Sequence, residues 1–433
     1  MAINNAANNT STPNISEESV KATSYRWSIC ILLFFATTIN YIDRNVLGLL
    51  KPVLQVKIGW TEAEYGLIIA AFTTAYALGQ TFFGSLIDKY GTKITYSVSV
   101  FVWSLAAMAH SFAGTPFGFG IARASLGLGE AGNFPAAIKS IAEWFPKKER
   151  AFATGLFNSG CNIGAVFAPI VVPWLTLTYG WQSAFIVTGA LGFIWLIFWY
   201  FMYEKPELHK KVNRKELEYI LSDKEEEVKE SIPWLKLLKY KQAWAFVIGK
   251  FLTDPIWYFY LFWLPGFLSH KYGLNLTNMG WPLIVIYTMT SIGSIGGGWL
   301  SGKFISLGWT VNKSRKVVMI ICAVLIVPIV IASNVSLWTS VFLIGLAAAS
   351  HQGWSANIFT TASDMFPKKA VGSIVGLGGT AGAIGGALFQ ISTGLILQFT
   401  GSYLSLFIIS GSAYLLAFLI FHLLVPRMET AKI

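Results

Sequence analysis

Six long stretches of the sequence contain no Asp, Glu, Lys or Arg, and they restrict the possible folds more than any other feature. A helix needs about 20 predominantly apolar residues to span a bilayer. The three longest stretches exceed twice that length, so each must hold two helices joined by a tight turn. The stretches cover residues 65–87, 94–122, 151–203, 272–302, 317–363 and 370–426. The chain is therefore expected to be embedded in a membrane.

Composition excludes a soluble fold. Hydrophobic residues make up 54% of the 433 residues and charged residues 12%, against about a quarter in soluble domains. A single soluble core could not bury that much apolar surface. Three further apolar segments carry a few charges and bring the expected number of helices to twelve. The sequence predicts an all-α integral membrane protein with transmembrane helices at 27–50, 62–87, 94–113, 116–142, 151–178, 181–203, 243–268, 279–304, 315–333, 336–362, 370–398 and 402–425.

A polar segment divides these helices into six and six. Residues 204–240 contain 19 charged or His residues and no spanning run, which predicts a solvated linker with one or two surface helices. The predicted domains are a disordered cytosolic tail (1–24), an N-terminal six-helix bundle (25–203), the cytosolic linker (204–240), a C-terminal six-helix bundle (241–426) and a short cytosolic tail (427–433).

The net charge of +11 follows membrane topology rather than nucleic-acid binding. If both termini lie on one side, the loops and tails of that side carry 25 of the 32 basic residues. The opposite loops carry Lys51, Lys57 and Lys271. Because cytoplasmic loops are enriched in Lys and Arg, both termini and the linker are expected in the cytoplasm. A nucleic-acid partner is not expected.

The two halves of the chain repeat each other. The tetrapeptide Phe145-Pro146-Lys147-Lys148 recurs 221 residues later as Phe366-Pro367-Lys368-Lys369. Four more identities, in the helices that follow, share the same offset. Two six-helix repeats around a central cavity are typical of secondary transporters, which bind substrate near the middle of the membrane.

The end of the second helix carries a known signature. Residues Gly84, Asp88, Lys89 and Gly91 lie in the sequence GSLIDKYGTK, which resembles the loop 2–3 motif of the major facilitator superfamily, although Thr92 replaces a usual basic residue. The resemblance implies the major facilitator fold. Gly84 would permit close helix approach and Gly91 a tight turn. We assign this motif, with Asp88 and Lys89, to gating rather than to substrate binding.

A narrower resemblance concerns the first and fourth helices. Tyr41-Ile42-Asp43-Arg44 and the pattern from Arg123 to Glu130-Ala131-Gly132 are similar to the anion:cation symporter branch. The stretches KFLTDPIW (250–257) and HQGWSA (351–356) are most similar to bacterial hexuronate permeases. The resemblance implies proton-coupled symport of a sugar acid such as galacturonate or glucuronate, by alternating access, across a bacterial inner membrane. Close relatives carry aldonates such as galactonate, and another organic anion remains an alternative, as does a membrane-embedded enzyme.

A few charges lie deep within the predicted helices, where a charged side chain costs roughly 2.5–3.5 kcal/mol unless it faces a partner or a polar cavity. A guanidinium binds a carboxylate through two parallel hydrogen bonds, so Arg44 is the first choice for the substrate carboxylate. Arg123 is the alternative, or else the partner of Glu130. Glu130 and Asp43 are the expected proton carriers, and for Asp43 a structural role has equal weight.

The remaining site residues follow from helical spacing. Tyr41 shares a face with Arg44, and polar or aromatic groups elsewhere are suited to sugar hydroxyls and ring faces. Lys250 and Asp254 are four residues apart and are expected to form a structural pair, and His351 is expected to be a buried core histidine. The other substrate-binding candidates are Tyr76, Asn158, Tyr258, Gln352, Trp354 and Ser355.

The expected partners are the sugar acid, protons and the lipid bilayer. The sequence has no phosphate-binding Gly-Lys-Ser/Thr loop and no group of residues with metal-ligand spacing, so we expect neither ATP-driven transport nor a cofactor or metal. The expected oligomeric state is a monomer. Nothing in the sequence separates galacturonate from glucuronate.

Overall fold

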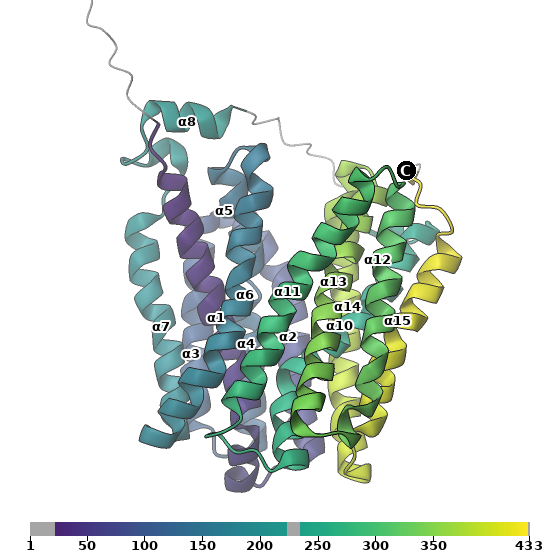
Figure 1. Ribbon diagram of the computed structural model, residues 1–433. Helices are drawn as coiled ribbons and strands as arrows, with labels where there is room; N and C mark the ends of the chain where they lie inside the picture. Colours follow the sequence, from purple (N-terminus) through teal and green to yellow (C-terminus); the bar gives the residue numbers. More distant parts are fainter. Residues whose placement is uncertain (1–21, 223–233, 432–433) are drawn as a thin grey trace, which may run out of the picture.

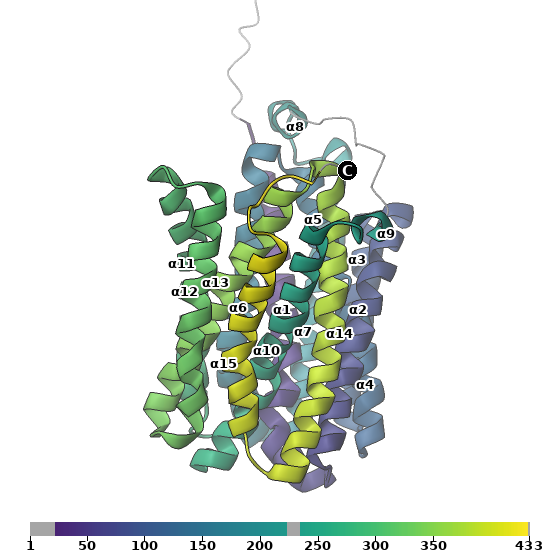
Figure 2. The ribbon, with the colours of Figure 1, turned by 90° about the vertical axis from the view of Figure 1, so that its right-hand side faces the viewer.

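A bundle of long helices makes up the protein in the computed structural model, which describes residues 22–222 and 234–431. The side chains of a few helical residues, Asp88 among them, are outside this description. Figures 1 and 2 show the helices running roughly side by side, with α8 lying across the end of the bundle at which the described part of the C-terminal segment also ends. We call this end the termini end and the opposite one the far end.

The helices of the first repeat are α1 (Tyr25–Ile58), α2 (Glu62–Tyr90), α3 (Thr92–Ala109), α4 (Pro116–Glu130), α5 (Asn133–Trp144), α6 (Lys147–Tyr179) and α7 (Trp181–Met202). The linker contains α8 (Arg214–Leu221) and α9 (Trp234–Leu237). The second repeat consists of α10 (Lys241–Tyr272), α11 (Gly280–Ser306), α12 (Val311–Ile326), α13 (Leu337–Met365), α14 (Lys368–Thr400) and α15 (Leu404–Leu424). Short 3-10 helices occupy His110–Phe112, Pro206–Leu208 and Val327–Asn334.

Within the described residues, nine helical segments are long and apolar enough to cross a membrane. The predicted single helix at 116–142 is wrong, because the chain breaks after Glu130 into α4 and α5. The predicted helix at 315–333 is also interrupted: it becomes a 3-10 helix after Ile326, where Pro328 lacks the N–H of a regular helical bond. The first helix extends to Ile58, so Lys51 and Lys57 lie within α1 and not in a loop.

The internal repeat is visible in the helices themselves. Helices α6 and α14 both contain 33 residues and begin 221 positions apart. Each follows a proline, Pro146 or Pro367, with φ −64° and ψ 152°, and each ends at a glycine, Gly180 or Gly401. Proline suits this position because it has no N–H and the first N–H groups of a helix have no partner within it.

The two repeats contact each other at the far end. The Glu62 N–H donates to Gln398 Oε1 (3.1 Å) and the Tyr65 hydroxyl donates to the Phe262 carbonyl (2.8 Å). A Cβ added to Gly66 would lie 2.7 Å from the Gln390 carbonyl oxygen, so α2 and α14 touch backbone to backbone there. Towards the termini end, a Cβ on Gly84 of α2 or Gly376 of α14 would meet nothing within 4 Å. The repeats therefore touch backbone to backbone at the far end, whereas these two glycines nearer the termini end have open space around them.

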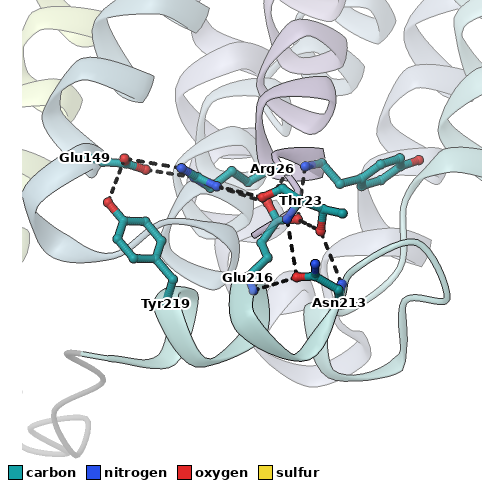
Figure 3. Close-up of polar contacts among 7 residues, drawn as sticks. Thr23, Arg26, Glu149, Asn213, Glu216 and Tyr219 are labelled. Atoms are coloured by element: carbon teal, nitrogen blue, oxygen red, sulfur yellow. Dashed lines mark hydrogen bonds and ion pairs between the residues drawn. The ribbon is translucent and has the colours of Figure 1, made fainter. Parts of the chain in front are cut away.

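The linker helix α8 is fixed to the first repeat by buried polar contacts (Figure 3). The Glu216 carboxylate, which is fully buried, accepts hydrogen bonds from the backbone N–H groups of Tyr25 and Arg26. It thereby supplies an acceptor and a negative charge to the start of α1, where a helix has unpaired N–H groups and a positive dipole end. Arg26 forms ion pairs with Glu216 (3.1 Å) and with Glu149 of α6 (2.9 Å), and Glu149 also accepts from the Tyr219 hydroxyl.

Candidate functional site

An ion pair between Arg44 and Glu130 lies in the interior of the first repeat. Arg44 is 3% exposed and Glu130 fully buried, and the Arg44 Nε and Nη2 atoms donate to the same Glu130 oxygen at 2.9 and 2.8 Å. Arg44 Nη2 also donates to Asn40 Oδ1 (3.3 Å), which lies one turn earlier on α1. The other oxygen of Glu130 has no hydrogen-bond partner among the described residues. The pair therefore leaves one carboxylate oxygen available for a proton or a water molecule.

Aromatic rings surround the Arg44 guanidinium. Its central carbon lies 4.7 Å from the Tyr41 ring, 4.8 Å from the Tyr76 ring and 5.2 Å from the Phe72 ring. Tyr258 of α10 lies near both Arg44 and Tyr76, so the second repeat closes this group. Such rings stabilise a cation through their negative faces without neutralising it. The candidate residues Tyr41, Arg44, Tyr76 and Tyr258 are thus brought together, while Phe72 was not foreseen because its apolar side chain gave no signal.

The other buried arginine has few partners. Arg123 is fully buried, and its Nη2 donates to the backbone carbonyl of Arg44 (2.8 Å). Its Nε and Nη1 atoms have no hydrogen-bond partner among the described residues. The rings of Phe72 and Phe262 lie 5.3 and 5.7 Å from its guanidinium. The sequence left Arg123 as a possible partner of Glu130, and the structure gives that position to Arg44.

Asp43 precedes Arg44 on α1 and forms no hydrogen bond with the Arg44–Glu130 pair. It is 2% exposed, and neither carboxylate oxygen accepts a hydrogen bond from a described residue. The hydroxyl of Thr188 on α7 lies next to it, and the charges of Glu130 and Arg123 act on it. A buried charged carboxylate without hydrogen bonds is costly, and the geometry favours either the protonated form or a bound water.

The candidates on α13 separate into two groups. Gln352 and Ser355 are partly exposed, whereas Trp354 is fully buried, with its ring 5.6 Å from the Tyr414 ring. Trp354 therefore offers no exposed ring face to a sugar in this conformation. His351 is 3% exposed, bonds to the Tyr414 hydroxyl through Nδ1 (2.6 Å) and stacks on Trp257 at 5.3 Å. The half-buried Trp257 was not foreseen as a candidate, although it ends the quoted α10 stretch.

The other candidates are placed as follows. Lys250 and Asp254 form an ion pair of 2.7 Å, and the Lys250 ammonium lies 3.9 Å from the Phe359 ring. Asn158 is exposed and accepts a weak hydrogen bond from the Cys161 thiol (3.5 Å).

In the loop motif, Gly91 has φ +82°, as the tight turn requires, and Gly84 has open space around it. Lys89 is exposed and lies over the Tyr90 ring, and the side chain of Asp88 is outside the described part.

Comparisons with known proteins agree with this architecture. Residues 33–390 match the Major Facilitator Superfamily, so the chain belongs to this family of membrane transporters and is not an enzyme. The fold prediction is confirmed. A D-xylose-proton symporter has a TM-score of 0.76 at 13% identity, covering 94% of this chain and 100% of that one. An inward-facing bacterial homologue of the lysosomal transporter Spinster has a TM-score of 0.73 at 17% identity, covering 94% and 98%.

Relatives in sequence are sugar-acid transporters. The chain is 32% identical to the hexuronate transporter of Escherichia coli K12, over 88% of this chain and 90% of that protein. It is 32% identical to the galacturonate transporter of Dickeya chrysanthemi, over 76% and 96%. The D-galactonate transporter of Escherichia coli O6:H1 is 28% identical, over 90% and 93%. The protein is thus a multi-pass secondary transporter related to carriers of sugar acids.

Proposed function

We propose that the protein is a proton-coupled symporter of a sugar acid, with hexuronates (galacturonate or glucuronate) as the preferred class. The observation that carries this proposal is the buried Arg44–Glu130 pair beneath the rings of Tyr41 and Tyr76. A fixed guanidinium that already binds one carboxylate is suited to bind another. The sugar-acid relatives support this choice of substrate class.

Competition for Arg44 couples the proton to the substrate. When Glu130 is charged, it occupies two donors of Arg44 and keeps the cation neutralised. When Glu130 accepts a proton, it loses its charge, and Arg44 becomes free for the carboxylate of the substrate. A proton gradient can drive accumulation only through a group that binds the proton differently in two states, and this exchange supplies that difference.

Asp43 is the second candidate proton carrier. Its two oxygens accept no hydrogen bond from the described residues, and the charges of both Glu130 and Arg123 act on it. A change in the protonation of one carboxylate would therefore change the electrostatic environment of the other. A purely structural role for Asp43 would leave Glu130 as the only carrier.

Sugar hydroxyls require polar groups from both repeats. Gln352 and Ser355 of α13 and Asn158 of α6 are partly or fully exposed and provide donors and acceptors. Tyr258 supplies a hydroxyl close to Arg44. Hydroxyl contacts of this kind would distinguish hexuronates from aldonates, since an open-chain aldonate presents its hydroxyls differently.

We place the termini end and the linker in the cytoplasm of a bacterial inner membrane, because most basic residues lie at that end. The far-end contacts then close the periplasmic side, and the conformation opens inward. The bundles are assigned to residues 25–203 and 241–426, and the functional unit is a monomer.

The test uses purified protein in proteoliposomes. Counterflow of labelled galacturonate, glucuronate and galactonate identifies the substrate, and we expect a hexuronate to be preferred. Preference for galactonate would favour the aldonate alternative, and a failure of all three would refute the sugar-acid assignment.

Coupling is tested separately with Glu130→Gln, which keeps the shape of the side chain and removes its charge. We expect this variant to retain counterflow and to lose accumulation driven by a pH gradient. Arg44→Lys should be poor in both assays, since an ammonium cannot form the paired hydrogen bonds. Wild-type accumulation by Glu130→Gln would transfer the proton role to Asp43 or His351.

A further inference from the structure

A buried lysine lies at the far end, where the two repeats meet. Lys51, near the end of α1, is 2% exposed, and its ammonium lies 2.7 Å from a carboxylate oxygen of Glu62 on α2. Gln55 donates to the other oxygen of Glu62 (3.0 Å). These three residues belong to the first repeat, so the ion pair moves with that repeat as one unit.

Groups from both repeats surround this ammonium. Its distance to the Trp263 ring of α10 is 4.9 Å, and the Tyr65 ring of the first repeat lies 5.1 Å away on α2. A Cβ added to Gly266 would lie 3.0 Å from the ammonium, so the glycine leaves room for it. We call Trp263, Gly266 and Tyr403 the lysine socket. Trp263 and Gly266 belong to α10, and Tyr403 is the residue immediately before α15, so the socket belongs to the second repeat.

Neighbouring contacts hold the same seam closed. Trp263 is fixed by its own hydrogen bond, from Nε1 to Gln390 Oε1 (2.6 Å), and Tyr65 donates across the seam to the Phe262 carbonyl. Among the described residues, no ion pair joins the two repeats. The Lys51–Trp263 contact is therefore a cation–π interaction between the two repeats. When it breaks, Lys51 does not have to exchange its ion-pair partner, because Glu62 belongs to the same repeat.

We propose that Lys51 is a gate residue of the far end, which closes the seam by entering the lysine socket and leaves it with Glu62 when that end opens. Its ion pair with Glu62 is retained in both states, so opening exposes a neutralised cation instead of an isolated buried charge. For the Lys51 side chain, only the contact with Trp263 and the burial are lost. Such a contact is strong enough to bias a conformational equilibrium and weak enough to break in each cycle. The inference does not depend on which anion is transported.

The experiment measures how often the far end is open. Cys161 is partly exposed and lies near Tyr41 and Arg44, whereas Cys30 and Cys322 are buried. With the last two replaced by Ala, a membrane-impermeant maleimide applied from the far-end side reacts with Cys161 only when that side opens. We expect Lys51→Met to raise this labelling rate by about 2- to 30-fold, the range of a partly to fully desolvated cation–π contact.

Matched variants separate gating from general damage. Lys57→Met, at an exposed position of the same helix, should be labelled at the same rate as the protein in which Lys51 and Lys57 are both intact; we call this the background rate. Lys51→Met/Glu62→Gln also removes the carboxylate that Lys51→Met leaves without a cation, and it should still be labelled faster than the background rate. Lys51→Arg keeps the positive charge and should be labelled at close to the background rate. If Lys51→Met cannot be produced, Trp263→Leu removes the ring while keeping the ion pair and should give the same increase.

Two results would overturn the proposal. The first is a labelling rate for Lys51→Met or Trp263→Leu equal to that of Lys57→Met. The second is a lower melting temperature without any change in labelling from the far side, which would assign Lys51 to folding alone.

Discussion

Replacement of Arg44 by Met should destabilise the protein as well as stop transport. Met keeps much of the length of the side chain but leaves the fully buried Glu130 without the cation that contacts it at 2.8 Å. Removing one member of a buried ion pair costs about 3–5 kcal/mol, because the remaining charge is buried and uncompensated. Arg123, which is close to Glu130 and has unused donors, should hold the loss near 3 kcal/mol.

The loss can be expressed as a melting temperature. A change of 1 kcal/mol shifts the midpoint by about 2–4 °C in a domain of roughly 200 residues, and by about half that in a chain twice as long. Arg44→Met should therefore melt about 3–6 °C below the parent protein in detergent. The double variant Arg44→Met/Glu130→Gln should recover most of this difference, because the Glu130 charge that lost its partner is removed as well, but it should not recover uptake.

The assay is thermal unfolding of the parent, both single variants and the double variant, combined with counterflow. The double-mutant cycle isolates the interaction between the two side chains. The buried-pair reasoning fails if Arg44→Met has the same melting temperature as the parent protein. It also fails if the double variant loses more stability than the two single variants added together. If the double variant also transports, Arg44 does not bind the substrate.

Three further predictions concern stability. Glu216→Gln should lower the free energy of unfolding by about 1.5–3 kcal/mol, the usual contribution of a hydrogen bond to a charged group, and Arg214→Gln, at a solvent-exposed position, is the control in the same melting assay. Burial, together with the charge of Lys211, lowers the pKa of His209 below its ordinary 6.5, so the folded protein binds this proton less readily than the unfolded chain. The contribution of His209 to stability should therefore be greatest above pH 6.5 and decrease as the pH falls below it. His209→Phe, compared with the parent by melting across pH 5–8, should remove this part of the pH dependence. Gly160→Ala should be destabilising because its Cβ would lie 2.5 Å from the Phe34 carbonyl oxygen, whereas Gly376→Ala, with nothing within 4 Å, should be neutral or stabilising; equal melting temperatures would contradict the close packing of α1 and α6.

The positions of most helices follow from the sequence because of the membrane. In lipid, no water is present to bond the backbone, so the N–H and C=O groups of a helix form hydrogen bonds within their own segment. A long charge-free run therefore forms helices. Proline and glycine then determine the ends, as at Pro146 and Gly180. The break after Glu130 was not foreseen, although Gly132 and Pro135 are a local signal for it, because a proline has no N–H for the helical bond to the carbonyl four residues earlier.

The residues of the site could be named from the sequence, but their partners could not. A charge in an apolar helix is costly unless a partner or a polar cavity compensates it. The sequence alone therefore pointed to Asp43, Arg44, Arg123 and Glu130. Helical spacing places two residues on one face but does not say which face of which helix lies opposite. Gly127 of α4 is an example, because only the structure shows that a Cβ there would lie 2.4 Å from the backbone carbonyl oxygen of Phe72 on α2.

The sequence by itself determined that the chain spans a membrane, that its halves repeat, and which buried charges require an explanation. Only the tertiary structure decided that Glu130 pairs with Arg44, 86 residues away, that Trp354 is buried, and that Lys51 enters the second repeat. The physical reason is the range of each interaction. Hydrophobic runs and helix ends act within one segment, whereas ion pairs, ring contacts and burial depend on which helices pack together.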